Sequence, residues 1–172
     1  VLITSAIIGI VTAIVVVRYG AFNSSVLLRN QAYEVALAIR EEQVYSVSVR
    51  GEGGNFRDAY GIHIENLPTQ QYILFVDADD DGEYDADEEV DTFTVDSRFE
   101  ISEVCLGTVS APGCGKDSMT VTFKRPDFDA NMRSSPAAGS LANRGAITLE
   151  PASRGSGTRT ILIQSTGLIS VE

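Results

Sequence analysis

The chain opens with an apolar run that contains no charged side chain before Arg18. Residues 1–17 read VLITSAIIGIVTAIVVV. As an α-helix this run would be about 25 Å long, slightly short of the roughly 30 Å hydrocarbon core of a bilayer. The pattern predicts a helix that is apolar on all sides, and a few apolar residues ahead of Val1 would let it span a membrane.

The chain then keeps a helical rhythm but becomes amphipathic. Apolar residues return on one helical face, spaced by four, three and four positions: Leu28, Ala32, Val35 and Ile39. We expect the helix to end near Tyr45. A continuous helix over residues 1–45 would be about 68 Å long, more than a domain built from the remaining residues could cover. The apolar half must therefore be buried in lipid or against other copies of the chain.

From about residue 46 the pattern changes from helical to alternating, which is typical of strands. Gly, Pro, Asn and Ser residues separate the alternating runs. We expect eight strands, at residues 60–65, 71–76, 90–95, 99–106, 118–124, 146–150, 158–164 and 168–171. Such a series predicts an antiparallel sheet or a small sandwich that ends in a hairpin. The expected fold class is α+β. The N-terminal helical part takes up residues 1–50, of which residues 1–17 are the apolar assembly or membrane segment, and a β-rich domain takes up residues 51–172.

The formal net charge of −11 is concentrated in one short segment. Of the 24 acidic residues, ten lie in residues 77–91, and this segment contains no basic residue. The rest of the chain is almost neutral. Nucleic-acid binding depends on clustered Lys and Arg, so we expect no nucleic-acid partner.

The acids in this segment match the twelve-residue calcium loop D-x-D-x-D-G-x5-E. Carboxylates on alternate residues converge when the chain curls around a hard cation, and Gly82 permits the sharp turn. The predicted calcium ligands are Asp77, Asp79, Asp81, the backbone carbonyl of Glu83, Asp85 and Glu88. Residues 71–76 read QYILFV and predict a strand, where an EF-hand would have a helix.

Two other interpretations of the acidic sequences stay open at this point. The segment at residues 77–91 could be a solvated acidic hairpin loop without a metal ion. Asp127, Asp129 and Asn131 match the calcium pattern more weakly and could form a second site, but this sequence lacks the glycine and the terminal acid. We expect a loop there.

The two cysteines, Cys105 and Cys114, lie close together in a stretch that contains Gly and Pro. Structural zinc needs three or four soft ligands, and the only histidine, His63, is far away in sequence. We expect one disulfide closing a small surface loop, which would indicate an oxidising location, with two free buried thiols as the alternative. His63 is expected to be a half-exposed strand residue. No nucleophile with a neighbouring base is visible, so we expect no enzyme activity.

The N-terminal run and the acidic segment resemble the type IV pilins and the pseudopilins of type II secretion systems. Those subunits begin with a processed F-T-L-I-E block, absent from the sequence here, followed by an apolar helix of the kind V-x-I-x-x-A-I-I-G-I-x-x-A-I. The residues that match are Val1, Ile3, Ala6, Ile7, Ile8, Gly9, Ile10, Ala13 and Ile14. The strand and loop at residues 72–89 and the closing run at residues 165–171 are similar to a minor-pseudopilin branch whose globular part is a β-sandwich.

This resemblance implies a filament subunit that polymerises through its apolar helix. The residues that would pack in the filament are Val1, Ile3, Ile7, Ile8, Gly9, Ile10, Ala13, Ile14 and Val17. Val17 stands where the family often has a proline, and Gly20 and residues 23–25 could loosen the helix instead.

The resemblance also implies partners and a location. Before assembly the chain would sit in inner-membrane lipid, pilus or secretion machinery would assemble it with copies of itself, and it would end in an extracellular filament at the cell surface. The alternative function is a membrane-anchored, calcium-dependent surface adhesin or binding domain.

Overall fold

The computed structural model describes residues 2–48, 58–108, 110–135, 143–153 and 157–172, without the side chains of residues 16–22. Within these residues one long helix is followed by nine strands, which confirms the expected α+β fold class. The elements are α1 (Leu2–Val47), β1 (Ala59–Glu65), β2 (Gln71–Asp77), β3 (Glu89–Thr94), β4 (Phe99–Gly107), β5 (Ser118–Phe123), β6 (Ala130–Ser135), β7 (Arg144–Pro151), β8 (Arg159–Gln164) and β9 (Ile169–Val171).

Strand β6 is absent from the eight strands that the sequence predicts. The expectation of a loop at Asp127, Asp129 and Asn131 is therefore wrong for Asn131, which lies in β6. The strand reads ANMRSS and lacks apolar alternation, because it is an edge strand held by pairing with β5 along its whole length.

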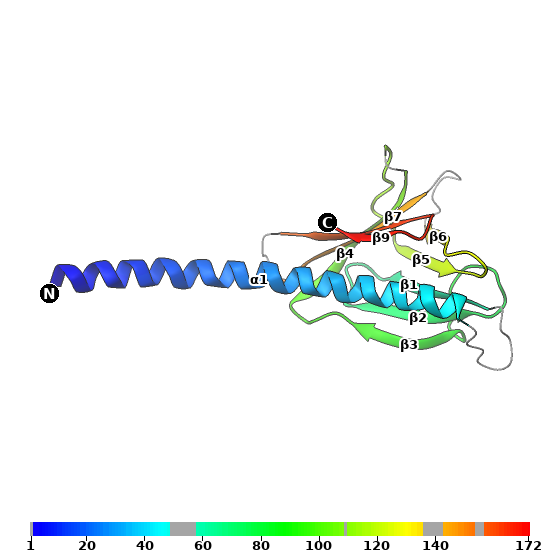
Figure 1. The fold of residues 1–172 in the computed structure, drawn as a ribbon, viewed down its shortest axis with the longest axis horizontal. Helices are drawn as coiled ribbons and strands as arrows, with labels where there is room; N and C mark the ends of the chain where they lie inside the picture. Colours follow the sequence, from blue (N-terminus) through cyan, green and yellow to red (C-terminus); the bar gives the residue numbers. More distant parts are fainter. Residues whose placement is uncertain (1, 49–57, 109, 136–142, 154–156) are drawn as a thin grey trace.

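The nine strands form two antiparallel sheets (Figure 1). One has the order β3-β2-β1-β5-β6 and the other the order β4-β7-β8-β9. Both sheets contribute to one hydrophobic core, which also contains one face of α1. Strand β1 is central in its sheet, and six of its seven residues are buried, so both of its faces are covered.

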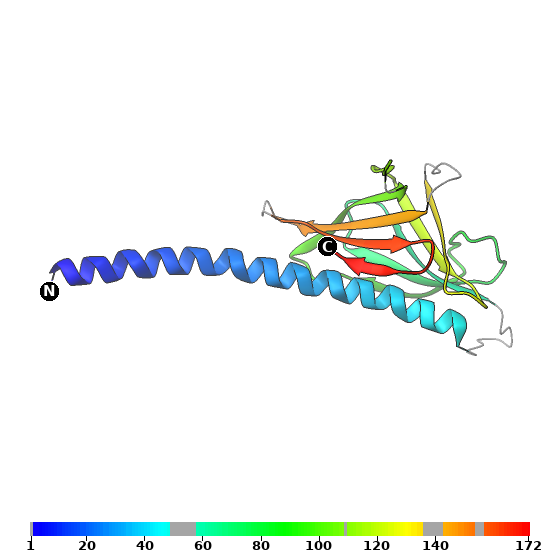
Figure 2. The same cartoon turned by 45° about the horizontal axis from the view of Figure 1, so that its top comes forward.

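Helix α1 runs unbroken from Leu2 to Val47, through the segment around Gly20 that the sequence marks as a possible weak point. Its second half lies along the β-domain, while its first half projects away from it (Figures 1 and 2). The 4-3-4 stripe expected from the sequence is the face that packs: Leu28, Ala32, Val35 and Ile39 are all buried. Burying a Leu, Val or Ile side chain contributes about 1.5 to 3 kcal/mol, so this half of the helix is an integral part of the domain core.

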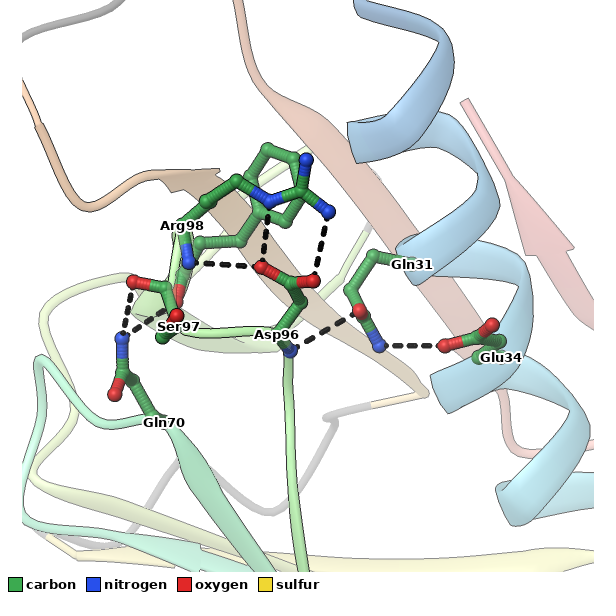
Figure 3. Close-up of polar contacts among 7 residues, drawn as sticks. Gln31, Glu34, Gln70, Asp96, Ser97 and Arg98 are labelled. Atoms are coloured by element: carbon green, nitrogen blue, oxygen red, sulfur yellow. Dashed lines mark hydrogen bonds and ion pairs between the residues drawn. The ribbon is translucent and has the colours of Figure 1, made fainter. Parts of the chain in front are cut away.

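Polar side chains also tie α1 to the loop between β3 and β4 (Figure 3). Gln31 Oε1 accepts a hydrogen bond from the backbone N–H of Asp96 at 3.1 Å, and Gln31 Nε2 donates to Glu34 at 2.9 Å. The Asp96 carboxylate is held by Arg98 at 2.8 Å, and these hydrogen bonds lower the pKa of Asp96 to about 2. The Asp96 carboxylate therefore stays ionised at physiological pH, and these hydrogen bonds fix the loop beside the helix.

The turn between β8 and β9 is held against the other side of the helix. Arg40 Nη2 donates to the carbonyl oxygen of Ile169 at 2.8 Å. Gln43 Nε2 donates to the carbonyl oxygens of Phe128 and Gly167, each at 3.0 Å. Gly167 has a φ of 78°, and a side chain there would collide with the Phe128 carbonyl, so this close approach requires glycine.

Glu42 lies on the buried face of α1, and only 3% of its surface is exposed. Burial, with a smaller contribution from the neighbouring charge of Glu41, raises the pKa of Glu42 to about 7. A neutral carboxyl group is much less costly to bury than a carboxylate. The helix therefore packs best on the domain when Glu42 is protonated.

Candidate functional site

The acidic segment forms a loop between β2 and β3, called here the acidic loop (residues 78–88). It begins directly after Asp77, the last residue of β2, whose side chain is 2% exposed. The two carboxylate oxygens of Asp77 accept hydrogen bonds from the backbone N–H groups of Asp81 at 3.1 Å and Gly82 at 3.0 Å. Gly82 has a φ of 75°, the left-handed conformation that the sharp turn requires. Asp77 is thus the buried centre around which the loop curls.

The structure brings together three of the predicted calcium ligands. One carboxylate oxygen from each of Asp77, Asp79 and Asp81 lies within 4.8 Å of the other two. Asp79 accepts a hydrogen bond from the N–H of Asp81 at 3.2 Å, and Asp81 accepts one from the N–H of Glu83 at 2.7 Å. These bonds point the three carboxylates into one turn, where they offer oxygen ligands of the kind that Ca²⁺ prefers.

The carboxylates of the other predicted ligands do not belong to this group of three. Glu88 closes the loop instead, because its two oxygens accept hydrogen bonds from the N–H groups of Ala78 at 2.7 Å and Asp85 at 3.3 Å. The Glu83 carboxylate forms an ion pair with Arg133 at 3.0 Å, which leaves its backbone carbonyl as the predicted ligand.

Burial also affects the electrostatics of this turn. Burial raises the pKa of the Asp77 carboxyl group, and the nearby charge of Glu88 adds to this effect, while the hydrogen bonds from Gly82 and Asp81 oppose it. The net direction is upward. A cation beside this carboxylate would favour its ionised form.

Two basic residues that the sequence analysis missed lie against the acidic loop. Lys124 follows β5 and pairs with Asp80, and Arg133 in β6 pairs with Glu83. A side chain at Gly82 would come within 2.9 Å of the Asn131 amide nitrogen, so the turn itself rests on β6. The acidic segment contains no basic residue of its own, but the fold brings two to it from later in the chain.

An aromatic side chain fixes the loop to the face of the sheet that points away from α1. Tyr84 stacks on His63 with ring centroids 4.7 Å apart and meets the edge of Phe75 at 5.5 Å. His63 is 8% exposed and shares a 2.8 Å hydrogen bond with Thr120, so the expectation of a half-exposed histidine is wrong. The acidic loop covers it. This burial lowers the pKa of His63, although the Glu65 carboxylate partly opposes the shift.

Cys105 and Cys114 are joined by a disulfide, as expected from their spacing, with an S–S distance of 2.05 Å. Cys105 lies in β4, and the loop that follows returns to it through a hydrogen bond from the N–H of Leu106 to the carbonyl of Gly113 at 2.9 Å. The disulfide therefore pins a surface loop to the edge of the four-stranded sheet.

The predicted assembly residues lie on the projecting half of α1. Every side chain from Leu2 to Val15 is exposed, and a side chain at Gly9 would meet nothing within 4 Å. Val1 and the side chain of Val17 lie outside the described residues. The residues described with side chains include no helix that is both long enough and apolar enough to cross a membrane.

Searches of the sequence against protein-family models and against curated proteins find no match. Among solved structures, the chain is similar to the type IV minor pilin FimU of Pseudomonas aeruginosa in two crystal forms. One alignment covers 84% of this chain and 92% of the FimU chain, with a TM-score of 0.46 and 14% identity. The other covers 88% of this chain and 92% of that one, with a TM-score of 0.49 and 14% identity.

Proposed function

We propose that this chain is a structural subunit of an extracellular type IV pilus-like filament, or pseudopilus, and that it polymerises through the first half of α1. One observation carries the proposal. From Leu2 to Val15 the helix projects from the domain (Figure 1). All side chains of this segment are exposed, and none of them is charged.

Such a helix is unstable when surrounded by water. Its five isoleucines are between 56% and 77% exposed: Ile3, Ile7, Ile8, Ile10 and Ile14. Covering one such side chain contributes about 1.5 to 3 kcal/mol. The apolar surface runs all the way round, so one partner face cannot cover it, whereas a bundle of copies or a lipid phase can. Head-to-tail contacts that do not close into a ring would give a helical filament.

The apolar half of α1 also suggests where the subunit would lie before assembly. Inner-membrane lipid would cover the apolar half before assembly, and pilus or secretion machinery would move it from lipid into the growing filament. The β-domain and the disulfide would then face an oxidising exterior.

We further propose that the acidic loop binds calcium. Asp77, Asp79 and Asp81 supply an all-oxygen group suited to a hard cation, and the Glu83 carbonyl, Asp85 and Glu88 would complete the ligand set. The ion would join the end of β2 to the start of β3. Lys124 and Arg133 already offset part of the negative charge, so calcium would tighten a loop that is closed without it.

Immunogold electron microscopy of fractions sheared from the cell surface tests the proposal. An antibody against the β-domain should label fibres along their length. A membrane-anchored adhesin, the alternative function, would leave the antibody on membrane fragments and the fibres unlabelled. Labelled membrane fragments with unlabelled fibres would contradict the filament proposal.

A further inference from the structure

A pocket of about 310 Å³ opens on the outer face of the four-stranded sheet. We call it the outer-sheet pocket. Its lining includes Glu103, Arg144, Thr148, Thr160, Leu162 and Glu172. The volume is at the lower end of the range for small-molecule sites, so the pocket suits a small ligand. None of these residues belongs to the acidic loop or to α1.

The strand register places four of the lining residues in one row across the sheet. Glu103 of β4 pairs with Thr148 of β7, which pairs in turn with Thr160 of β8. Thr160 exchanges two backbone hydrogen bonds with Glu172, which follows β9. Neighbouring strands are about 4.8 Å apart, so the row is about 14 Å long. Ile147, next to Thr148, has no exposed surface, so the row points away from the core.

Arg144 brings a positive charge to the same pocket. It is half-buried and lies on β7 four residues before Thr148, about 13 Å along the strand and on the same face. Among the described residues, Arg144 forms no ion pair with Glu103 or Glu172, although all three line the pocket. The strands thus hold opposite charges apart, and a ligand that carries both charges can bridge them.

The loop closed by Cys105 and Cys114 forms one wall of the pocket. A carboxylate oxygen of Glu103 lies within 4.8 Å of both sulfur atoms. A side chain at Gly107 would collide with the Ala111 carbonyl oxygen, so the loop packs directly on β4. The disulfide and this close packing fix the wall before a ligand arrives, which lowers the entropy cost of binding.

We propose that the outer-sheet pocket binds a short peptide of about three small residues with both ends free. Arg144 binds the peptide carboxylate through charge-assisted hydrogen bonds. The ammonium group lies in the row between Glu103 and Glu172. The hydroxyl groups of Thr148 and Thr160 both donate and accept hydrogen bonds, so they suit the peptide groups between the two ends. An extended tripeptide is about 10 Å long, which matches the spacing along β7 once the side chains reach inward.

The charges of the pocket select this class of ligand. Two carboxylates beside one guanidinium disfavour a purely anionic ligand, such as a phosphate or an acidic sugar. A simple cation would leave Arg144 without a partner. The floor at Leu162, which is 7% exposed, is apolar and shallow, so it suits small side chains. The inference goes beyond the proposed filament function and does not depend on it.

A titration with tri-alanine tests the proposal. The full chain is isotopically labelled, kept in solution by a mild detergent and followed by NMR as the peptide is added to millimolar concentration. Amidated tri-alanine lacks the carboxylate, and N-acetylated tri-alanine lacks the ammonium group. Arg144→Gln removes the proposed carboxylate partner. Arg159→Gln is the matched control, because Arg159 is a half-buried arginine of the same sheet that does not line the pocket.

We expect tri-alanine to shift the amide signals of Thr148 and Thr160 saturably, and each blocked peptide to bind about tenfold more weakly. Arg144→Gln should bind tri-alanine as weakly as the wild type binds the amidated peptide, and Arg159→Gln should bind it as tightly as the wild type. No saturable shift, or equal binding of all three peptides to the wild type, would overturn the assignment. The peptide series uses the wild-type chain, so this test does not depend on the folding of a variant.

Discussion

The imidazole ring of His63 lies stacked on the phenol ring of Tyr84, with the ring centroids 4.7 Å apart. The contact joins the central strand of the five-stranded sheet to the middle of the acidic loop. A loop with so many like charges would be expected to stay in solvent, yet here its one aromatic residue anchors it to the sheet. The loop is therefore part of the folded domain and can transmit ligand binding to domain stability.

The first prediction concerns this anchor. Replacing Tyr84 by Ala removes the stacking on His63 and the edge contact with Phe75, and we expect it to lower the free energy of unfolding by about 1 to 2 kcal/mol. Tyr84→Phe is the matched control, because it keeps both ring contacts and loses only the 3.2 Å hydrogen bond to Glu89. Urea unfolding of a chain that starts at residue 23 measures both. Equal stability of Tyr84→Ala and wild type would contradict the anchoring.

The second prediction concerns pH. The pKa of Glu42 is raised from an ordinary value of 4.5 to about 7, so between these pH values the folded state binds more protons than the unfolded state. Stability must then fall as pH rises through this window, by about 3 kcal/mol in total. Glu42→Gln imitates the protonated form, so we expect it to stabilise the protein at pH 8 and to have little effect at pH 4.5.

Thermal unfolding at several pH values measures the Glu42 effect. The same substitution at the exposed Glu103 serves as a control and should give no pH-dependent gain. If the Glu42→Gln protein has the same stability as wild type at pH 8, burial of the ionised Glu42 carboxylate does not destabilise the protein and the prediction is wrong.

The third prediction concerns the disulfide. The bond between Cys105 and Cys114 closes a short loop, and the loop-entropy relation assigns it about 2 to 3 kcal/mol. Because both cysteines are bonded, alkylation under denaturing conditions without reductant should add no mass to the native protein. Cys105→Ser with Cys114→Ser should unfold at a lower urea concentration by a corresponding amount. Two alkylated cysteines in the unreduced protein would rule out the bond.

The fourth prediction concerns calcium. Because the ion would bind the folded loop and not the unfolded chain, it should stabilise the domain by about 2.7 kcal/mol at one hundred times the dissociation constant. An extracellular module typically binds at about 0.1 to 1 mM. Asp79→Asn with Asp81→Asn should keep the hydrogen-bonded turn and lose the calcium-dependent rise in melting temperature. Identical melting of the wild type in chelator and in calcium at about 5 mM would show that the loop is a solvated acidic turn.

Some of this architecture could be predicted from the sequence, because local patterns determine it. The 4-3-4 spacing from Leu28 to Ile39 identified the buried face of α1, since a helix repeats its environment every 3.6 residues. The alternating runs identified the strands of the core. The loop after Asp77 was visible because a carboxylate on every second residue with a glycine has few other structural uses.

Other features could not be predicted, because distant parts of the chain create them. Strand β6 owes its conformation to the neighbouring β5, and its own polar sequence carries no strand pattern. Alternation placed His63 on the outer face of β1 but could not indicate that Tyr84 covers it. Lys124 and Arg133 are remote from the acidic loop in sequence, so only the sheet order brings them to it.

The substitution Ile8→Asp tests the proposed filament most directly. Ile8 is 66% exposed on the projecting half of α1, so the change leaves the fold of a single subunit intact. In a filament it would bury an unpaired carboxylate in every subunit, at a cost of several kcal/mol each. Ile8→Leu keeps the apolar surface and serves as the control. Electron microscopy of sheared cell-surface fractions should find fibres from wild type and Ile8→Leu and none from Ile8→Asp, whereas normal fibres from Ile8→Asp would contradict assembly through this helix.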